Sequence, residues 1–390
     1  MRHILPPPSA WISALVATAV GFGGTIVLVV QALRRMGATV EEAGSAVTAM
    51  CLAIAVAGAV LSFRLRMPVV LAWSTPGAAL LVTSPPVSWP VACGAFVIAG
   101  LIGMAVGAVP LLGRAAVAIP AAIASAMLAG VLLPFGLQAF REAHADPGFV
   151  AVLGITFIIG RARFPLYALL LVLAAGIGLI LVRGGFGALP AGAILGTLTP
   201  VTPSFDAGAL IGIALPLTLV TLASQNLPGI AVLRVAGYEP RPAPLLIGTG
   251  LASVAAAPFG AHAVNLAAIT AAICTSPEAD ADEMRRWRTG VIYAAFYLLL
   301  AIFSPLLVRC FAALPPIAIA VLTGLAIIPA LLGALEAMLS APEHRDATIL
   351  TLLVTASGLT VFGVGAAFWG IVTGIAAIAI KRLFSLRAAG

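Results

Sequence analysis

Residues 256–270 read AAPFGAHAVNLAAIT, which places a proline, a glycine, a histidine and an asparagine inside an otherwise apolar run. Pro258 and Gly260 discourage a regular helix at the start of this stretch. If the residues that follow are helical, His262 and Asn265 share one face, because side chains three residues apart are neighbours on a helix. The stretch therefore predicts the start of a buried helix that points inward, with the rest of the chain as its scaffold.

The composition is that of a membrane protein. Of the 390 residues, 62% are hydrophobic and only 8% are charged, whereas soluble domains carry about 25% charged residues. A soluble fold could not cover its surface with so few charges. The first apolar run follows MRHILPPPSA without a cleavage region, so we expect it to remain in the mature protein as a span.

Breaks at charged, proline-rich or glycine-rich points divide the chain into about fourteen apolar segments, given that a bilayer span requires about 20 residues. We predict an all-α polytopic membrane protein. Its spans are expected near residues 10–32, 43–62, 68–83, 89–111, 117–138, 148–160, 164–182, 207–233, 242–256, 259–274, 289–308, 315–338, 347–363 and 366–384.

The basic residues support this count, because cytoplasmic loops collect Lys and Arg. With the N-terminus inside, fifteen of the 20 basic residues fall on the cytoplasmic side, and the other five are Arg34, Arg35, Arg141, Arg183 and Arg309. The net charge of +7 is spread in ones to threes between apolar runs, which indicates topology and not a nucleic-acid surface. We therefore expect a multi-pass inner-membrane protein in contact with lipid, with both termini cytoplasmic and no nucleic-acid partner.

Two of the predicted spans are short and interrupted. Segment 68–83 contains Pro76-Gly77, and segment 259–274 begins with proline, glycine, histidine and asparagine. Each is third in its own set of seven. Such a pair at corresponding positions of two halves indicates a transporter's binding site at the bilayer midplane.

A faint internal repeat agrees with this division. Residues 33, 34 and 37 (Leu, Arg and Gly) recur at an offset of 200, as Leu233, Arg234 and Gly237. Because seven spans is an odd number, the second set must be inverted relative to the first. We predict one repeat over residues 1–200 and another over residues 201–390.

Few ionisable residues lie inside the predicted spans, and an intramembrane ionisable residue is by default a functional hypothesis. His262 has an ordinary pKa of about 6.5, which suits proton uptake and release, although a neutral imidazole bonded to a neighbouring span is the alternative. Glu336, near the cytoplasmic end of segment 315–338, is a second candidate proton carrier, or a side chain that reaches the interface. Asp206 stands ahead of segment 207–233, where a carboxylate can cap the helix.

Polar groups beside the chain breaks are the candidate substrate-binding residues. Hydroxyls and freed backbone N–H groups at a helix start can receive a carboxylate without a formal positive charge. Interhelical hydrogen bonding is the alternative role for such residues. The predicted substrate-binding set is Ser74, Thr75, Gly77, Gln225, Asn226, Gly260, His262 and Asn265.

Other kinds of site are not indicated. The sequence has no Walker or dinucleotide glycine loop, no HExxH and no Cys or His cluster, so we predict neither a metal nor a cofactor. One histidine with scattered serines and asparagines does not make a catalytic set, so we predict that the protein is not an enzyme. The four cysteines show no metal-type spacing and are expected to be reduced packing residues.

Three separated motifs carry a family resemblance: PVVLAWSTPGAALL, TLASQNLPGIAVLRVAGY and FGAHAVNLAAITAAICTSPEA. They resemble the benzoate/proton symporters of the BenE family, over essentially the whole chain. The resemblance implies a fold similar to the uracil permeases, with a core domain at about 10–112 and 207–308 and a gate domain at about 117–183 and 315–384. In that fold, spans three and ten each contain a short extended piece followed by a half helix.

The same resemblance bears on the substrate. Uracil permeases place carboxylates in spans eight and ten, and the positions that correspond here are near Gln225 and His262. Neither carboxylate is present, which argues against a nucleobase.

We therefore expect a secondary active transporter that imports benzoate or a similar aromatic carboxylate with a proton. The open alternatives are transport of another organic anion or a nucleobase, and a passive anion channel. A homodimer formed through the gate domain is an expectation from the fold only.

Overall fold

The computed structural model describes residues 5–112 and 120–388. The first residues of the predicted span 117–138, together with Arg2 and Arg114, lie outside this range. In chain order the elements are α1 (Pro8–Gly23), α2 (Ile26–Arg35), α3 (Val40–Leu65), β1 (Leu71–Trp73), α4 (Thr75–Thr83), α5 (Trp89–Ala108), α7 (Ala121–Arg141), η1 (Glu142–His144), α8 (Pro147–Arg163), α9 (Ala168–Arg183), α10 (Ala207–Ala209), η2 (Leu210–Ala214), α11 (Leu215–Thr221), η3 (Leu222–Asn226), α12 (Leu227–Val235), α13 (Pro242–Ala256), η4 (Ala257–Phe259), β2 (Val264–Leu266), α14 (Ile269–Thr275), η5 (Glu283–Arg285), α15 (Trp287–Ala312), α16 (Pro316–Leu339), η6 (Pro342–His344), α17 (Arg345–Ala356) and α18 (Ala366–Ala388).

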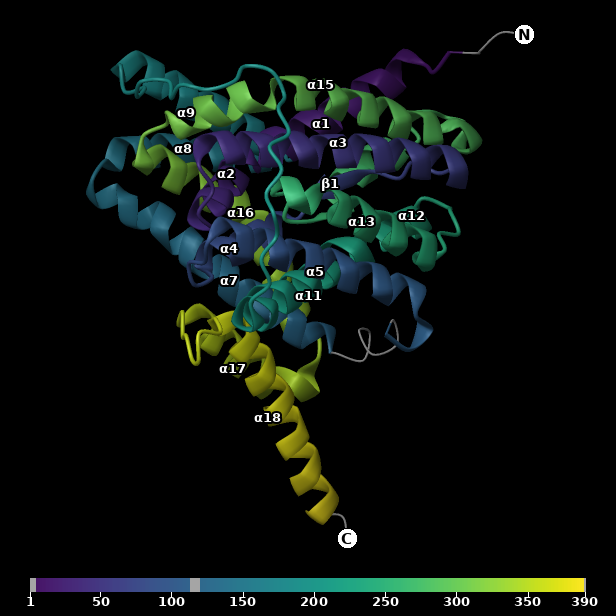
Figure 1. Cartoon of the computed structure of the whole chain (residues 1–390), viewed down its shortest axis with the longest axis vertical. Coiled ribbons are helices and arrows are strands. Elements are labelled where there is room, and N and C mark those ends of the chain that lie inside the picture. The colour runs from purple at the N-terminus through teal and green to yellow at the C-terminus, as the bar shows by residue number, and fades with distance from the viewer. Residues whose placement is uncertain (1–4, 113–119, 389–390) are drawn as a thin grey trace.

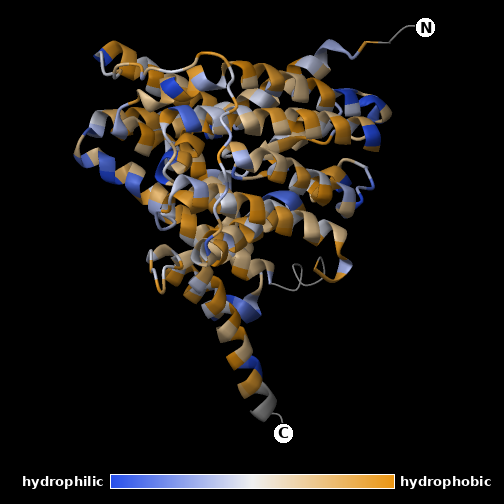
Figure 2. Ribbon diagram, in the orientation of Figure 1, coloured by the Kyte–Doolittle hydropathy of each residue, from blue (hydrophilic) through white to orange (hydrophobic). Residues whose placement is uncertain are grey.

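The chain is a helical membrane protein, as its composition predicts. Nine helices in the described ranges are long and apolar enough to cross a bilayer. Each of the predicted segments contains at least one helix, and segments 68–83 and 259–274 combine a strand with a short helix. Figure 2 shows hydrophobic residues along the helices, whereas hydrophilic residues gather at the two lateral edges, where many helices end. Over residues 5–112 and 120–388, the prediction of an all-α protein holds apart from one two-stranded sheet.

This sheet is formed by β1 and β2, which pair antiparallel with Leu71 opposite Leu266 and Trp73 opposite Val264. β1 lies beside α3 and β2 lies beside α13 (Figure 1). A short helix follows each strand, so the two strand–helix units run in opposite directions. The expectation that His262 and Asn265 share a helical face is wrong, because both lie in the extended segment and the helix begins only at Ile269.

The local sequence explains the extended segment. Gly260 ends η4 with a left-handed backbone, φ +92°, which a residue with a Cβ rarely adopts. The N–H of Ala267 then donates to the carbonyl of Val70 at 2.9 Å, so the ladder continues past the named strand. Backbone bonds between the two broken segments thus replace the helical bonds that each segment loses.

The long interrupted helix that follows residue 206 begins as predicted. Asp206 Oδ1 accepts a hydrogen bond from the N–H of Ala209 at 2.9 Å and caps α10. Two π-helical turns, η2 and η3, interrupt the helix, and η3 carries Gln225 and Asn226. Such turns are rare and are found mostly at functional sites.

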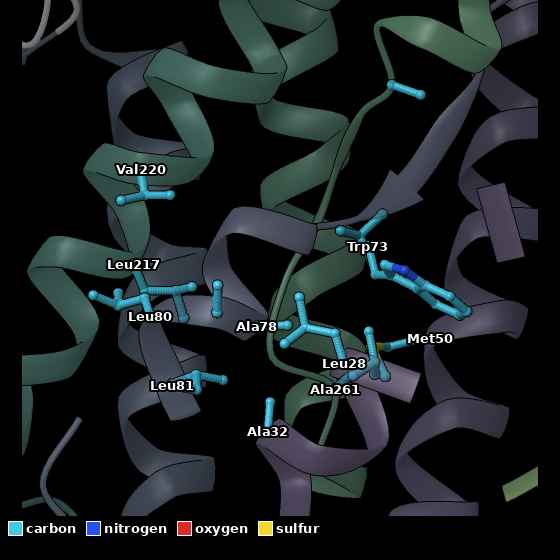
Figure 3. Packing of buried hydrophobic residues seen from close by; sticks show 14 of the residues in the cluster. Leu28, Ala32, Met50, Trp73, Ala78, Leu80, Leu81, Leu217, Val220 and Ala261 are labelled. Atoms are coloured by element: carbon cyan, nitrogen blue, oxygen red, sulfur yellow. The ribbon is translucent and has the colours of Figure 1, made fainter. Parts of the chain in front are cut away.

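Buried side chains from several elements surround the start of α4. Figure 3 shows Leu28 of α2, Met50 of α3, Trp73 of β1, Ala78 of α4 and Leu217 of α11 close together. All five are 2% exposed or less. Because lipid tails are as apolar as leucine, this cluster is stabilised mainly by close van der Waals packing.

The helices pack in two groups. The core group consists of α1–α5 and α10–α15, in which α3 lies against α15 and α5 against α13. The second group consists of α7–α9 and α16–α18, in which α7 lies against α16 and α17, and is labelled the gate group after the domain expected there. A separate apolar cluster, which includes Phe149, Leu153, Val172 and Leu322, joins α8, α9 and α16.

The residues that recur at an offset of 200 occupy matching positions at two helix ends. Gly37 after α2 and Gly237 after α12 have φ values of +94° and +95°. At each end the following N–H donates to the carbonyl of the matching leucine, Leu33 or Leu233, at 3.1 Å. The three matching residues therefore close their helices with the same C-terminal motif.

An extended linker, residues 184–206, connects α9 to α10 and crosses the front of the molecule in Figure 1. The N–H of Val201 donates to the carbonyl of Pro258 at 2.7 Å, and the N–H of Ser204 donates to that of Pro90 at 2.9 Å. The predicted repeat boundary at residue 200 falls inside this linker.

Candidate functional site

A cavity of about 380 Å³ lies between the core group and the gate group. Its core wall is formed by α1, β1, the start of α4, η3 and the start of α14. Its gate wall is formed by α7, α9 and α16. The lining residues are Val20, Gly21, Thr25, Ala72, Trp73, Thr75, Pro76, Ser125, Leu128, Leu169, Ala223, Ser224, Gln225, Pro228, Ala267, Ala268, Ile269, Thr270, Ala326, Pro329, Ala330, Gly333, Ala334 and Ala337.

The cavity wall carries no formal charge. Among the described residues that line it, none is acidic, basic or a histidine. Its polar side chains are those of Thr25, Thr75, Ser125, Ser224, Gln225 and Thr270. A mostly apolar cavity with a few convergent polar groups is typical of a small-molecule site.

The N-terminus of α4 lies in this wall and brings partial positive charge to it. Ser74 is the N-cap, and its Oγ accepts hydrogen bonds from the N–H of Gly77 at 3.0 Å and from Thr221 Oγ1 at 2.8 Å. Thr75 and Pro76, the first helical residues, line the cavity. The aligned peptide dipoles of a helix place partial positive charge at its N-terminus, which stabilises an anion there.

His262 lies behind this helix start and does not line the cavity. Its side chain is fully buried, and its Nε2 is 3.0 Å from the carbonyl oxygen of Ser74. A carbonyl oxygen only accepts, so Nε2 carries the hydrogen and donates it. Nδ1 is buried and has no hydrogen-bond partner within the described residues. In this conformation the imidazole connects the second broken segment to the cap of the first.

The two asparagines also lie behind the cavity, where they fix β2. Asn226 Oδ1 accepts from the N–H of Leu266 at 2.9 Å, and Asn265 Nδ2 donates to the carbonyl of Leu266 at 2.9 Å. Asn226 lines a second, smaller cavity of about 30 Å³. The bond from Leu266 to Asn226 holds the interrupted helix against the sheet, which is the structural role that the sequence left open as the alternative, whereas the Asn265 bond is local to β2.

Gly77 and Gly260 are required by close packing. A Cβ on Gly77 would lie 2.6 Å from Cδ1 of Leu217, and one on Gly260 would lie 2.3 Å from Cζ2 of Trp89. No real Cβ is found so close to another atom. Neither glycine lines the cavity, so each shapes the site through the position of its backbone.

Glu336 is exposed on α16. Its neighbours Gly333, Ala334 and Ala337 line the cavity, whereas Glu336 does not. Of the eight predicted substrate-binding residues, the structure thus brings Thr75 and Gln225 to the cavity lining, whereas the other six do not line it.

Other lining residues carry little sequence signal. Trp73 Nε1 donates to Thr25 Oγ1 at 2.7 Å, and Thr25 Oγ1 donates to the carbonyl of Gly21 at 2.8 Å. The ring of Phe22 packs against that of Trp73, with centroids 5.1 Å apart. Ser125 comes from an alanine-rich helix, where a single hydroxyl does not stand out.

The chain is similar in sequence to known membrane proteins. The profile of the family described as "BenE: Benzoate membrane transport protein" matches residues 6–380. The chain is 37% identical to "Inner membrane protein YdcO" of Escherichia coli (strain K12), over 99% of both chains. It is 32% identical to "Benzoate membrane transport protein" of Acinetobacter baylyi, over 95% of this chain and 94% of the relative.

Solved structures show a similar fold at low sequence identity. The transmembrane domain of a cyanobacterial bicarbonate transporter, BicA, superposes with a TM-score of 0.59 at 15% identity, over 94% of this chain and 97% of that domain. The structure of SLC26A9 superposes with a TM-score of 0.66 at 11% identity, over 97% of this chain and 65% of that protein.

Proposed function

The chain belongs to the BenE family of benzoate membrane transport proteins, and from this premise we propose that it imports benzoate or a similar aromatic carboxylate together with a proton. It is a membrane transporter and not an enzyme. Its relative YdcO is named an inner membrane protein, and we place this multi-pass chain in the inner membrane with both termini cytoplasmic.

The observation that carries the proposal is an uncharged cavity with the start of α4 in its wall. A carboxylate there meets the dipole of α4 and the hydroxyl of Thr75, with Gln225 on the same wall. The volume of about 380 Å³ lies near the lower end of the range for ligand pockets, which suits a molecule with one aromatic ring.

The apolar part of the cavity suits that ring. Trp73 Nε1 donates a hydrogen bond to Thr25, and Leu128, Leu169 and Pro329 line the same cavity from the gate group. A planar ring packs against such surfaces by dispersion and by offset or edge-to-face contacts with the indole. The substrate would then touch both groups of helices.

A proton is the natural companion of this anion. Moving one elementary charge across a membrane potential of 100 mV involves about 2.3 kcal/mol, so importing an anion against a negative interior is unfavourable by that amount. A proton carried in the same cycle cancels the charge. His262 is our proposed carrier, with Glu336 as a second, more exposed candidate.

In this proposal the transport step is a movement between the two groups. The cavity has one wall on each group, so relative displacement of the core group and the gate group changes which side of the membrane it faces. We extend the proposal to fourteen spans in two inverted repeats. The core domain would then be residues 10–112 and 207–308, and the gate domain residues 117–183 and 315–384, with a homodimer formed through the latter.

Equilibrium binding tests the substrate site. Isothermal titration of the purified protein with benzoate should give saturable binding, and Gln225→Ala should weaken it by roughly 10- to 100-fold, because a hydrogen bond to a charged group contributes about 1.5–3 kcal/mol. The matched control is Gln138→Ala, whose side chain is exposed at the end of α7. Absence of benzoate binding, or equal affinity in wild type and Gln225→Ala, would refute this site.

A further inference from the structure

A third cavity lies on the outer surface of the core group, between α3 and α13. It has a volume of about 480 Å³, and every residue in its lining is an alanine, glycine, valine, leucine or phenylalanine. Val56, Val60 and Leu251 belong to this lining and are 62%, 46% and 58% exposed. The cavity is therefore an apolar groove, termed here the α3–α13 groove, that opens toward the surroundings of the helices.

The two helices run antiparallel along the groove. At one end, the Cβ position of Gly248 lies 3.0 Å from Cδ1 of Leu61. At the other end, the Cβ position of Gly260, just beyond α13, lies 3.0 Å from Cβ of Ala46. The C-terminal end of α3 therefore lies beside the N-terminal end of α13.

At this shared end, each helix carries one arginine beyond its groove-lining residues: Arg64 on α3 and Arg241 just before α13. Arg64 follows Val56 and Val60 at steps of four residues, so it lies on the same face of α3. Arg241 precedes Gly248 by seven residues, which is two helical turns, and immediately precedes α13. Both arginines are exposed, and neither makes an ion pair or a hydrogen bond within the described part of the chain.

Aromatic residues mark the same end as a membrane–water interface. The guanidinium of Arg66, the C-cap of α3, lies 4.7 Å from the ring centroid of Phe63 and 4.6 Å from that of Trp287. Tryptophan and arginine anchors of this kind are typical of the headgroup region. The exposed arginines thus stand at headgroup depth, with the apolar groove below them.

The length of the groove matches one leaflet. From Ala49 to Leu61 the lining of α3 covers twelve residue steps, or about 18 Å at 1.5 Å per residue. Half of the hydrocarbon core of a bilayer is about 15 Å. Phe259 and Leu198 lie in the lining beyond the helical part.

We propose that the α3–α13 groove binds one acyl chain of an anionic phospholipid, whose phosphate pairs with Arg64 and Arg241. An apolar groove of leaflet depth accounts for the chain, and two exposed guanidiniums at its mouth account for the charge of the headgroup. Basic residues at the ends of membrane helices recognise anionic headgroups in this way. The proposal is independent of the substrate cavity, which lies on a different face of the core group.

Native mass spectrometry of the purified full-length protein tests the charge requirement. Wild type should retain phosphatidylglycerol in preference to phosphatidylcholine, and the double variant Arg64→Gln/Arg241→Gln should bind phosphatidylglycerol at least tenfold more weakly. The matched control is Arg161→Gln/Arg163→Gln, which removes an equally exposed arginine pair from the end of α8. Equal binding of the two lipids by wild type, or equal loss in both double variants, would overturn the proposal.

A second variant tests the groove itself. Ala53→Phe places a ring in the lining of α3 without changing charge, and it should lower phosphatidylglycerol binding while benzoate binding stays at the wild-type level. Inorganic phosphate should not compete for the lipid, because the acyl chain supplies part of the affinity. Competition by phosphate would overturn the proposal and show a simple anion site instead. A dimer mass that Ala53→Phe abolishes would overturn it too and show that the groove is an interface between two copies of the chain.

Discussion

At the scale of single residues, Ser74 is the point where the two broken segments meet. Its hydroxyl caps α4 and accepts from Thr221, and its carbonyl accepts from His262. Each contact comes from a different part of the chain. The backbone that begins α4 is therefore fixed by residues about 150 to 190 positions away in the sequence.

His262 has two separable roles in this account: it donates a hydrogen bond to Ser74, and we propose that it carries the coupled proton. Glutamine can supply an N–H donor near the position of Nε2 but cannot take up a proton at neutral pH. His262→Gln should therefore keep benzoate affinity within about threefold of wild type while losing accumulation driven by a pH gradient. His262→Ala, which removes both functions, should lower thermal stability and binding as well.

Binding and gradient-driven uptake, measured on the same preparations, separate these roles. If His262→Gln accumulates benzoate as wild type does, the histidine positions Ser74 and another group carries the proton. Glu336→Gln is then the next variant to examine, because Glu336 is the second residue predicted to carry the coupled proton.

At the scale of elements, the first turn of α4 is the part of the site that depends most on capping. Ser74→Ala removes the acceptor for Gly77 N–H, and the loss of a serine N-cap costs about 1 kcal/mol. The variant should melt at a lower temperature and should bind benzoate more weakly, because the helix start that faces the carboxylate is no longer fixed.

Asp206→Ala provides the comparison, since it removes an N-cap of similar strength from α10, which lies away from the cavity. Thermal melting should fall by a similar amount in both variants, whereas benzoate affinity should fall only in Ser74→Ala. Equal affinities in the two variants would mean that the start of α4 does not contact the substrate.

The residue pattern predicts the two broken segments but not the form of the second one, whose extended piece and short helix are implied only by the family resemblance. Pro258 and Gly260 correctly mark the end of regular helix. The extended conformation of His262 to Asn265 depends on pairing with residues near Val70 and on Asn226, which are remote in sequence. Local periodicity carries no information about such contacts, so the helical face expected for His262 and Asn265 does not form.

At the scale of the whole molecule, the cavity belongs to two groups of helices that meet around it. The core wall could be anticipated in part, since Thr75 and Gln225 stand beside chain breaks in the sequence. The gate wall could not be predicted from the sequence, because alanine and glycine, as at Ala326, Ala330 and Gly333, are common in any membrane helix. Only the packing of α16 against α7 and α9 gives them a position in the site.

We propose that this chain couples the entry of an aromatic carboxylate to that of a proton. The direct measurement is uptake of labelled benzoate by proteoliposomes that contain the purified protein, with and without an imposed pH gradient, acidic outside. We expect saturable accumulation above the external concentration, which collapses when a protonophore dissipates the gradient. Uptake that never exceeds equilibration, or that is the same with and without the gradient, would contradict it.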